Sequence, residues 1–127
     1  MKTIAIGFAL ATLLAGTALS QAAEAWKEAK VNGKSIFTDA NGMTLYTFDK
    51  DKDGLSNCYD TCAVNWPPLK ADADAAPTGE WIVVERKDGS KMWAYDGHPL
   101  YTFIKDEKAG DAKGEGVGGV WHIAEAD

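Results

Sequence analysis

The chain has 127 residues, of which 46% are hydrophobic and 25% are charged, a composition typical of one globular domain. Its formal net charge is -6 at pH 7. A negative surface repels polyanions, so nucleic acids and anionic lipid surfaces are excluded as expected partners.

The first 23 residues have the pattern of a secretory signal peptide. Lys2 precedes an apolar run from Ile4 to about Leu19, and small residues that suit cleavage follow at Ala22 and Ala23. The apolar run contains glycines and is shorter than the ~20 residues that a membrane-spanning helix needs. We therefore expect residues 24–127 to form one secreted, periplasmic β domain without a transmembrane span.

Four of the Asn-Gly and Asp-Gly pairs lie between short segments with strand composition in the mature chain. These dipeptides suit two-residue type I′ hairpins, because both central residues of that turn need a positive φ. The pairs are Asn32-Gly33, Asn41-Gly42, Asp88-Gly89 and Asp96-Gly97. Runs with strand composition lie between them, at residues 35–39, 43–49, 81–86, 91–95 and 100–104. The mature sequence shows no helical periodicity over a helix length, so it is predicted to be all-β.

The chain is also a tandem repeat. LYTFDKD at Leu45–Asp51 recurs as LYTFIKD at Leu100–Asp106. A shift of 55 residues aligns Trp66 with Trp121, whereas the segment around Phe37 needs a shift of 56. Each repeat is predicted to be a three-stranded meander plus a fourth strand, at residues 26–69 and 81–124, with a linker at 70–80. Meanders of this size are marginal alone, so we expect about eight strands packed as a small antiparallel sandwich or barrel with pseudo-twofold symmetry.

Three segments carry a resemblance to a known family. They are the doubled LYTF with an aspartate five residues after each tyrosine, SNCYDTCAVNWPPL at residues 56–69, and GVGGVWHIA at residues 116–124. The chain resembles the secreted-repeat lipoproteins defined by a Tyr-x4-Asp motif. The resemblance implies a secreted or periplasmic β-repeat protein, in a family without an established biochemical activity. Thr17 stands where many members have a lipidated cysteine, so a lipid anchor is not expected.

The repeated motif supplies the first candidate functional residues. A tyrosine and a phenylalanine two positions apart share one strand face, so they are expected in the core, while each aspartate follows its strand and can hold the next loop. Alternatively, the symmetry brings both aspartates together as the catalytic pair of a small hydrolase. The motif residues are Tyr46, Phe48, Asp51, Tyr101, Phe103 and Asp106.

An acidic loop in the first repeat resembles a calcium-binding loop. The order D-x-D-x-D-G places alternate carboxylates around a hard cation, and the ligands here would be Asp49, Asp51, Asp53 and Asp60. The aspartate at the twelfth position is shorter than the usual glutamate, and the preceding segment reads as a strand. A solvated acidic loop without a metal is therefore the alternative. No other cofactor is expected.

The two cysteines, Cys58 and Cys62, predict a disulfide, because thiols oxidise in secreted proteins and the count is even. The alternative is copper bound by both thiolates with His98 or His122, in a metal or redox protein. No motif for nucleophilic catalysis is recognisable, so the protein is not expected to be an enzyme. The favoured interpretation is a non-catalytic module that binds an envelope or extracellular ligand through loops 50–64 and 105–119, or a structural envelope component.

Overall fold

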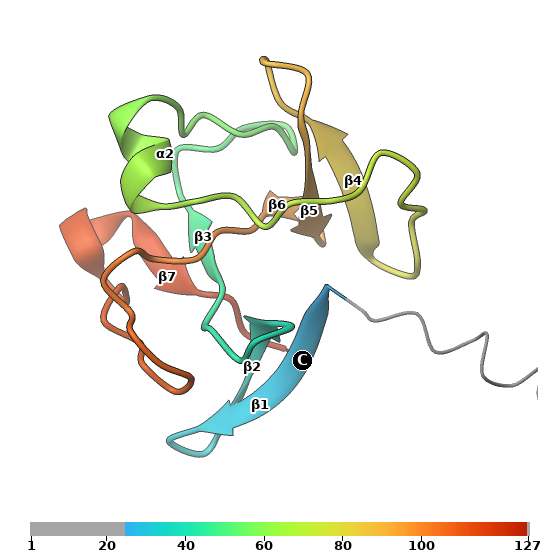
Figure 1. Cartoon of the computed structure of the whole chain (residues 1–127). Coiled ribbons are helices and arrows are strands. Elements are labelled where there is room, and N and C mark those ends of the chain that lie inside the picture. Colours follow the sequence, from blue (N-terminus) through green and yellow to red (C-terminus); the bar gives the residue numbers. More distant parts are fainter. Residues whose placement is uncertain (1–24, 127) are drawn as a thin grey trace, which may run out of the picture.

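The computed structural model describes residues 25–126, and the signal-peptide prediction falls outside this range. The described part consists of seven short strands, one five-residue helix and one 3-10 turn (Figure 1). The strands are β1 (Trp26–Val31), β2 (Lys34–Asp39), β3 (Tyr46–Phe48), β4 (Trp81–Glu85), β5 (Lys91–Tyr95), β6 (His98–Pro99) and β7 (Trp121–Ile123). The helical elements are α2 (Thr61–Asn65) and η2 (Val117–Gly119).

The all-β prediction is confirmed, with details that differ. Every strand pair is antiparallel, and three small sheets, β1-β2, β3-β7 and β4-β5-β6, pack against one another as in a sandwich without closing into a barrel. The predicted strand at residues 100–104 and the fourth strand of the first repeat pair only through isolated bridges, such as Pro68 with Tyr101. Helix α2 was not predicted, because five residues are too few to show helical periodicity.

Two of the four hairpin turns have the predicted type. Asn32 and Gly33 have φ of 53° and 83°, and they connect Val31 to its partner Lys34 as a two-residue loop. Asp96 and Gly97 do the same between β5 and β6, with φ of 51° and 81°. Both residues of each pair are left-handed, as a type I′ turn requires.

The other two turns contain three residues, so the type I′ prediction is wrong there. At Asn41-Gly42 only the glycine has a positive φ, and the backbone N–H of Asp39 donates to the carbonyl of Met43. The side chain of Asp39 stabilises this wider turn by accepting the N–H groups of Asn41 and Met43. The turn at Asp88-Gly89 also contains three residues, because the backbone N–H of Arg86 donates to the carbonyl of Ser90. The first repeat thus has a short turn and then a long one, and the second repeat has the reverse order, which explains the one-residue slip in the alignment.

The fourth segment of each repeat pairs with the other repeat. In the first half, Phe37 N–H donates to the carbonyl of Ala124, and Ala124 N–H donates to Leu45. In the second half, Trp93 N–H donates to Leu69, and Leu69 N–H donates to Leu100. Strand β7, from the end of the chain, accordingly lies beside β3 (Figure 1). Neither repeat therefore completes its own set of backbone hydrogen bonds.

Equivalent residues meet at the pseudo-twofold axis. Tyr46 and Tyr101 exchange both backbone hydrogen bonds, at 2.7 and 3.0 Å between nitrogen and oxygen. Beside them, the indoles of Trp66 and Trp121 stack with ring centroids 3.8 Å apart. Phe48 and Phe103 extend this stack at its two ends, at 4.2 and 4.0 Å. Half of the aromatic core comes from each repeat, so the core exists only when both are present.

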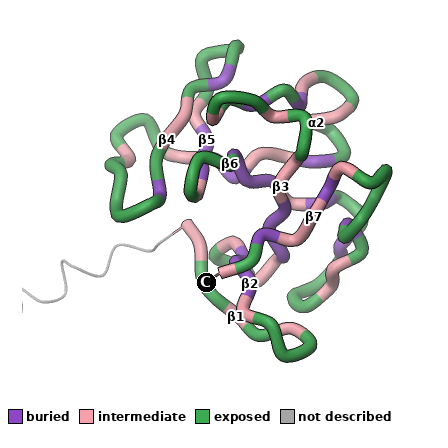
Figure 2. The backbone as a smooth tube through the Cα atoms, turned by 180° about the vertical axis from the view of Figure 1, so that it is seen from behind, coloured by how far each residue is buried: buried purple, intermediate pink, exposed green. Residues whose placement is uncertain are grey.

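A second aromatic cluster includes Trp26 and Trp81, which stack at 3.8 Å. Buried segments converge on the middle of the molecule, whereas the hairpin tips and the long loops are exposed (Figure 2). The described residues contain no helix that is long and apolar enough to traverse a bilayer.

Candidate functional site

The motif tyrosines and aspartates form crossed hydrogen bonds between the repeats. The phenol of Tyr46 donates to Asp106 Oδ2 at 2.6 Å, and the phenol of Tyr101 donates to Asp51 Oδ2 at 2.7 Å. Both tyrosines are fully buried. Burial raises the pKa of each phenol far above its ordinary value, so both stay protonated as donors. Each carboxylate is thus held by a phenol of the other repeat.

The second oxygen of each motif aspartate holds its own loop. Asp51 Oδ1 accepts the N–H of Asn57 at 2.7 Å, and Asp106 Oδ1 accepts the N–H of Lys113 at 2.8 Å. Asp106 is the more deeply buried of the two, with 6% of its surface exposed. Burial raises the pKa of Asp51, although its two hydrogen bonds and the nearby Arg86 oppose that rise. The Tyr-x4-Asp motif therefore ties each loop to the opposite repeat.

A buried arginine extends the contact between Tyr101 and Asp51 into a network. Arg86 is 5% exposed, and its Nη1 donates to Ser56 Oγ at 3.0 Å. Ser56 Oγ lies 2.6 Å from the phenol oxygen of Tyr101, which itself donates to Asp51. The positive and negative charges thus occupy the two ends of one hydrogen-bonded chain. Sequence reasoning missed Arg86, although the repeat alignment contains a signal: the first repeat has Val31 at this position.

The predicted disulfide between Cys58 and Cys62 is formed, and it occupies both thiols that the copper alternative would use. Cys58 is fully buried, and its carbonyl accepts Arg86 Nη2 at 2.7 Å. The guanidinium also lies over the ring of Tyr59, 4.3 Å from the centroid. These contacts attach the disulfide loop to the residue that follows β4, so loop 50–64 is closed on this side.

The four aspartates of the predicted calcium loop are not brought together as ligands. Asp49 contacts His122, whereas Asp51 contacts Tyr101 and the N–H of Asn57. Within residues 25–126, no group of three or more histidine, cysteine, aspartate or glutamate side chains is arranged to hold a metal ion.

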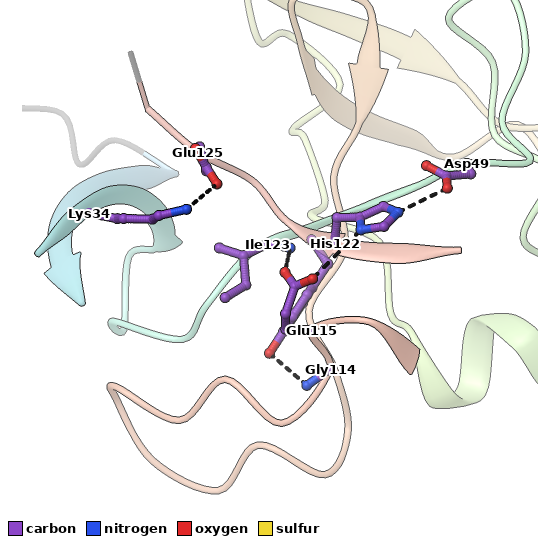
Figure 3. Close-up of polar contacts among 8 residues, drawn as sticks. Lys34, Asp49, Gly114, Glu115, His122, Ile123 and Glu125 are labelled. Carbon is purple, nitrogen blue, oxygen red and sulfur yellow. Dashed lines mark hydrogen bonds and ion pairs between the residues drawn. The ribbon is translucent and has the colours of Figure 1, made fainter. Parts of the chain in front are cut away.

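His122 lies on the surface between two acidic side chains (Figure 3). Its Nε2 is 2.9 Å from Asp49 Oδ2, and its Nδ1 is 3.6 Å from Glu115 Oε2. Glu115 also accepts the N–H of Ile123 at 2.9 Å, which fixes its carboxylate beside β7. The hydrogen bond to Asp49 raises the pKa of the His122 imidazole above its ordinary value. The histidine therefore joins loop 105–119 to the end of β3.

Replacing Asp49 by asparagine is expected to lower the pKa of His122 towards its ordinary value of 6.5, because the bond to Asp49 is the largest cause of the rise. A raised pKa in the folded state means that protonated His122 stabilises the fold below about pH 6.5, and that this contribution is lost as the pH rises through the folded pKa. An NMR titration of the imidazole in the wild-type and Asp49→Asn chains measures the difference. Identical midpoints in the two chains would contradict the assignment.

A groove lies next to Glu115, between the β1-β2 hairpin, loop 105–119 and the C-terminal segment. Its volume is about 390 Å³. Lys34 and Glu125 form an exposed ion pair at 3.4 Å on its wall, and Ile123 and Glu115 face it from the other side (Figure 3). The full lining is Val31, Asn32, Lys34, Ile36, Ala112, Glu115, Ile123 and Glu125. Apolar side chains and two carboxylates thus line the same groove.

Comparison with known proteins identifies the repeats. A sequence model of a family described as "Secreted repeat of unknown function" matches residues 29–70 and 82–125, which together make up more than half of the chain. The matched ranges correspond to the two predicted repeats, and they confirm the resemblance to the secreted-repeat lipoproteins. A search of curated proteins and a search of solved structures gave no match.

Proposed function

The chain belongs to the family of secreted repeats of unknown function, and from this we propose that it is a non-catalytic binding module of the periplasm whose ligand occupies the groove. The family is described as secreted, and the N-terminal leader pattern supports export. The observation that carries the proposal is the groove itself, about 390 Å³ in volume, which combines an apolar floor with charged walls.

The difference between the two halves supports binding over a purely structural role. Both halves share the crossed hydrogen bonds and the aromatic stack. Their loops differ, because loop 50–64 is closed by a disulfide and by Arg86, whereas loop 105–119 contains no cysteine and borders the groove. A rigid frame that presents one altered loop is a common arrangement for a binding site.

NMR of the isotope-labelled mature chain, mixed with fractions of its native envelope, tests this function. The amide signals of Ala112 and Ile123 are expected to shift, because both residues line the groove. Signals around Arg86, in the closed half, are expected to stay unchanged. Fractions that move no groove signal at all would refute the binding function.

A blocking variant sharpens the experiment. Ala112→Trp places an indole in the groove and is expected to abolish the shifts, whereas Glu107→Trp adds the same side chain to an exposed position of the same loop. Binding that survives in Ala112→Trp would indicate that a different face is involved.

A further inference from the structure

The groove and Arg86 occupy equivalent places in the two halves. The alignment of Trp26 with Trp81 continues along the strands and places Val31 on Arg86. Each of these residues closes the first hairpin of its repeat: Val31 pairs with Lys34, and Arg86 bonds to Ser90 through its backbone. The side chains of Val31 and Arg86 therefore start from equivalent positions of the backbone.

In the second half, the arginine fills the space between the sheet and the loop of the first repeat. Its Nη1 lies 3.5 Å from the sulfur of Met92 and 3.0 Å from Ser56 Oγ. Its Nη2 donates to the carbonyl of Cys58, and Tyr59 covers the guanidinium. A single arginine side chain thus joins strand β5 to loop 50–64.

The walls of the groove are the counterparts of these contacts. Ile36, in the floor, aligns with Met92. Asn57 and Lys113 are equivalent in the loops, because each donates its N–H to the motif aspartate of its own repeat, and so Ala112 and Glu115 correspond to Ser56 and Tyr59. Val31 is short and apolar, so its own side chain cannot bridge to the loop as that of Arg86 does. The groove is the first-half counterpart of the space that an arginine fills in the second half.

The charges of the groove also suit an arginine side chain. Glu115 and Glu125 line it, and carboxylates bind guanidinium groups in a planar, two-pronged geometry. Lys34 is mostly exposed and is paired with Glu125. One lysine against two glutamates gives the groove lining a net negative charge. Val31, Ile36 and Ile123 provide apolar surface for the methylene stem of a long cationic side chain.

We propose that the groove receives an arginine side chain from a partner protein, in the position that Arg86 holds within the other half. This inference rests on the proposed binding function and names the chemistry of its ligand. The negative net charge of the chain, -6 at pH 7, favours encounter with a basic segment of a partner.

The probe is a short peptide, acetyl-Gly-Arg-Gly amide, compared with the same peptide carrying citrulline, a neutral side chain of similar shape. NMR titration of the mature chain is expected to show shifts of the Ala112 and Ile123 amides with the arginine peptide, weakened by salt. Citrulline is expected to bind about tenfold more weakly or worse, because its hydrogen bonds to the carboxylates lack the charge. Equal binding of the two peptides would overturn the inference.

A variant that fills its own groove gives the second test. Val31→Arg is expected to fold, to insert its side chain as Arg86 does, and to lose binding of the arginine peptide. Lys30→Arg adds the same side chain to an exposed neighbour on β1 and is expected to bind as the wild type does. If Val31→Arg fails to fold, the double variant Glu115→Gln and Glu125→Gln replaces it and is also expected to lose binding. Undiminished binding by the folded variant would refute the proposal.

The outcomes separate this inference from the function on which it rests. An envelope fraction that shifts groove signals while the arginine peptide does not would leave the binding function intact and overturn the ligand class. Absence of both responses would overturn both.

Discussion

A chain that stops at residue 75 is expected to remain unfolded, and so is a chain that starts at residue 76. The first fragment lacks the C-terminal segment that bonds to Phe37 and Leu45, and the second lacks the segment that bonds to Trp93 and Leu100. Each fragment also has one indole of the Trp66 and Trp121 stack. The expected loss is the whole free energy of folding, about 5–15 kcal/mol for a domain.

Near-ultraviolet circular dichroism measures this loss, because packed tryptophans give a signal that unfolded chains lack. Neither fragment is expected to show it alone, whereas an equimolar mixture of residues 24–75 and 76–127 is expected to recover it. The break lies in the linker after Ala75, outside the strands. Cooperative thermal unfolding of either isolated fragment would show that the repeats are independent.

Replacing Asp106 by alanine is expected to destabilise the fold more than replacing Asp51. Asp106→Ala leaves the buried phenol of Tyr46 without its acceptor, which costs about 1–3 kcal/mol, and it also removes the acceptor of the partly buried Lys113 N–H. Asp51→Ala is less costly, because Asp51 is only partly buried and Tyr101 keeps its contact with Ser56. Urea denaturation of the two variants measures the difference in free energy of unfolding.

A double-mutant cycle then tests whether the cost arises at the crossed hydrogen bond. Tyr46→Phe removes the phenol hydroxyl, which donates to Asp106 and accepts the N–H of Gly114, and Asp106→Asn keeps the size of the acceptor side chain. The two changes are expected to be non-additive, since both remove the same contact. Additive effects, or a larger cost for Asp51→Ala than for Asp106→Ala, would show that the motif does not act through this bond.

The repeated architecture could be predicted from the sequence because its signals are local. Asn32-Gly33 and Asp96-Gly97 adopt the turn that their residue types favour. At Asn41-Gly42, the side chain of Asp39 accepts two N–H groups and stabilises a wider turn instead. The dipeptide alone contains no information about that side chain, so the turn type was predicted wrongly.

The exchange of fourth segments could not be predicted, because equivalent segments have equivalent patterns. Leu69 suits the space beside Leu45 as well as it suits the space beside Leu100, since both are the leucine of the same motif. Periodicity indicates which face of a strand is buried, but the choice between two alike partners depends on how far the long loops reach.

The candidate site also has one part that the sequence predicts and one part that it does not. The disulfide of Cys58 and Cys62 follows from cysteine count and compartment, which are properties of composition. The groove lies where Val31 replaces Arg86, and the sequence shows this replacement but not the open space beside it. Aligning the repeats and asking where a charge replaces an apolar residue would have singled out this position.

The exchanged segments also constrain when the protein can fold during its synthesis. Residues 121–125 bond to β3 and to Phe37 of β2, so the first half cannot finish folding until this segment of the second half has been made. Contacts that are so distant in sequence form slowly, because the intervening chain must first close a long loop. Because neither half completes its hydrogen bonds alone, we expect the chain to stay unfolded until both halves have been made, and an unfolded chain can be threaded through a narrow export channel.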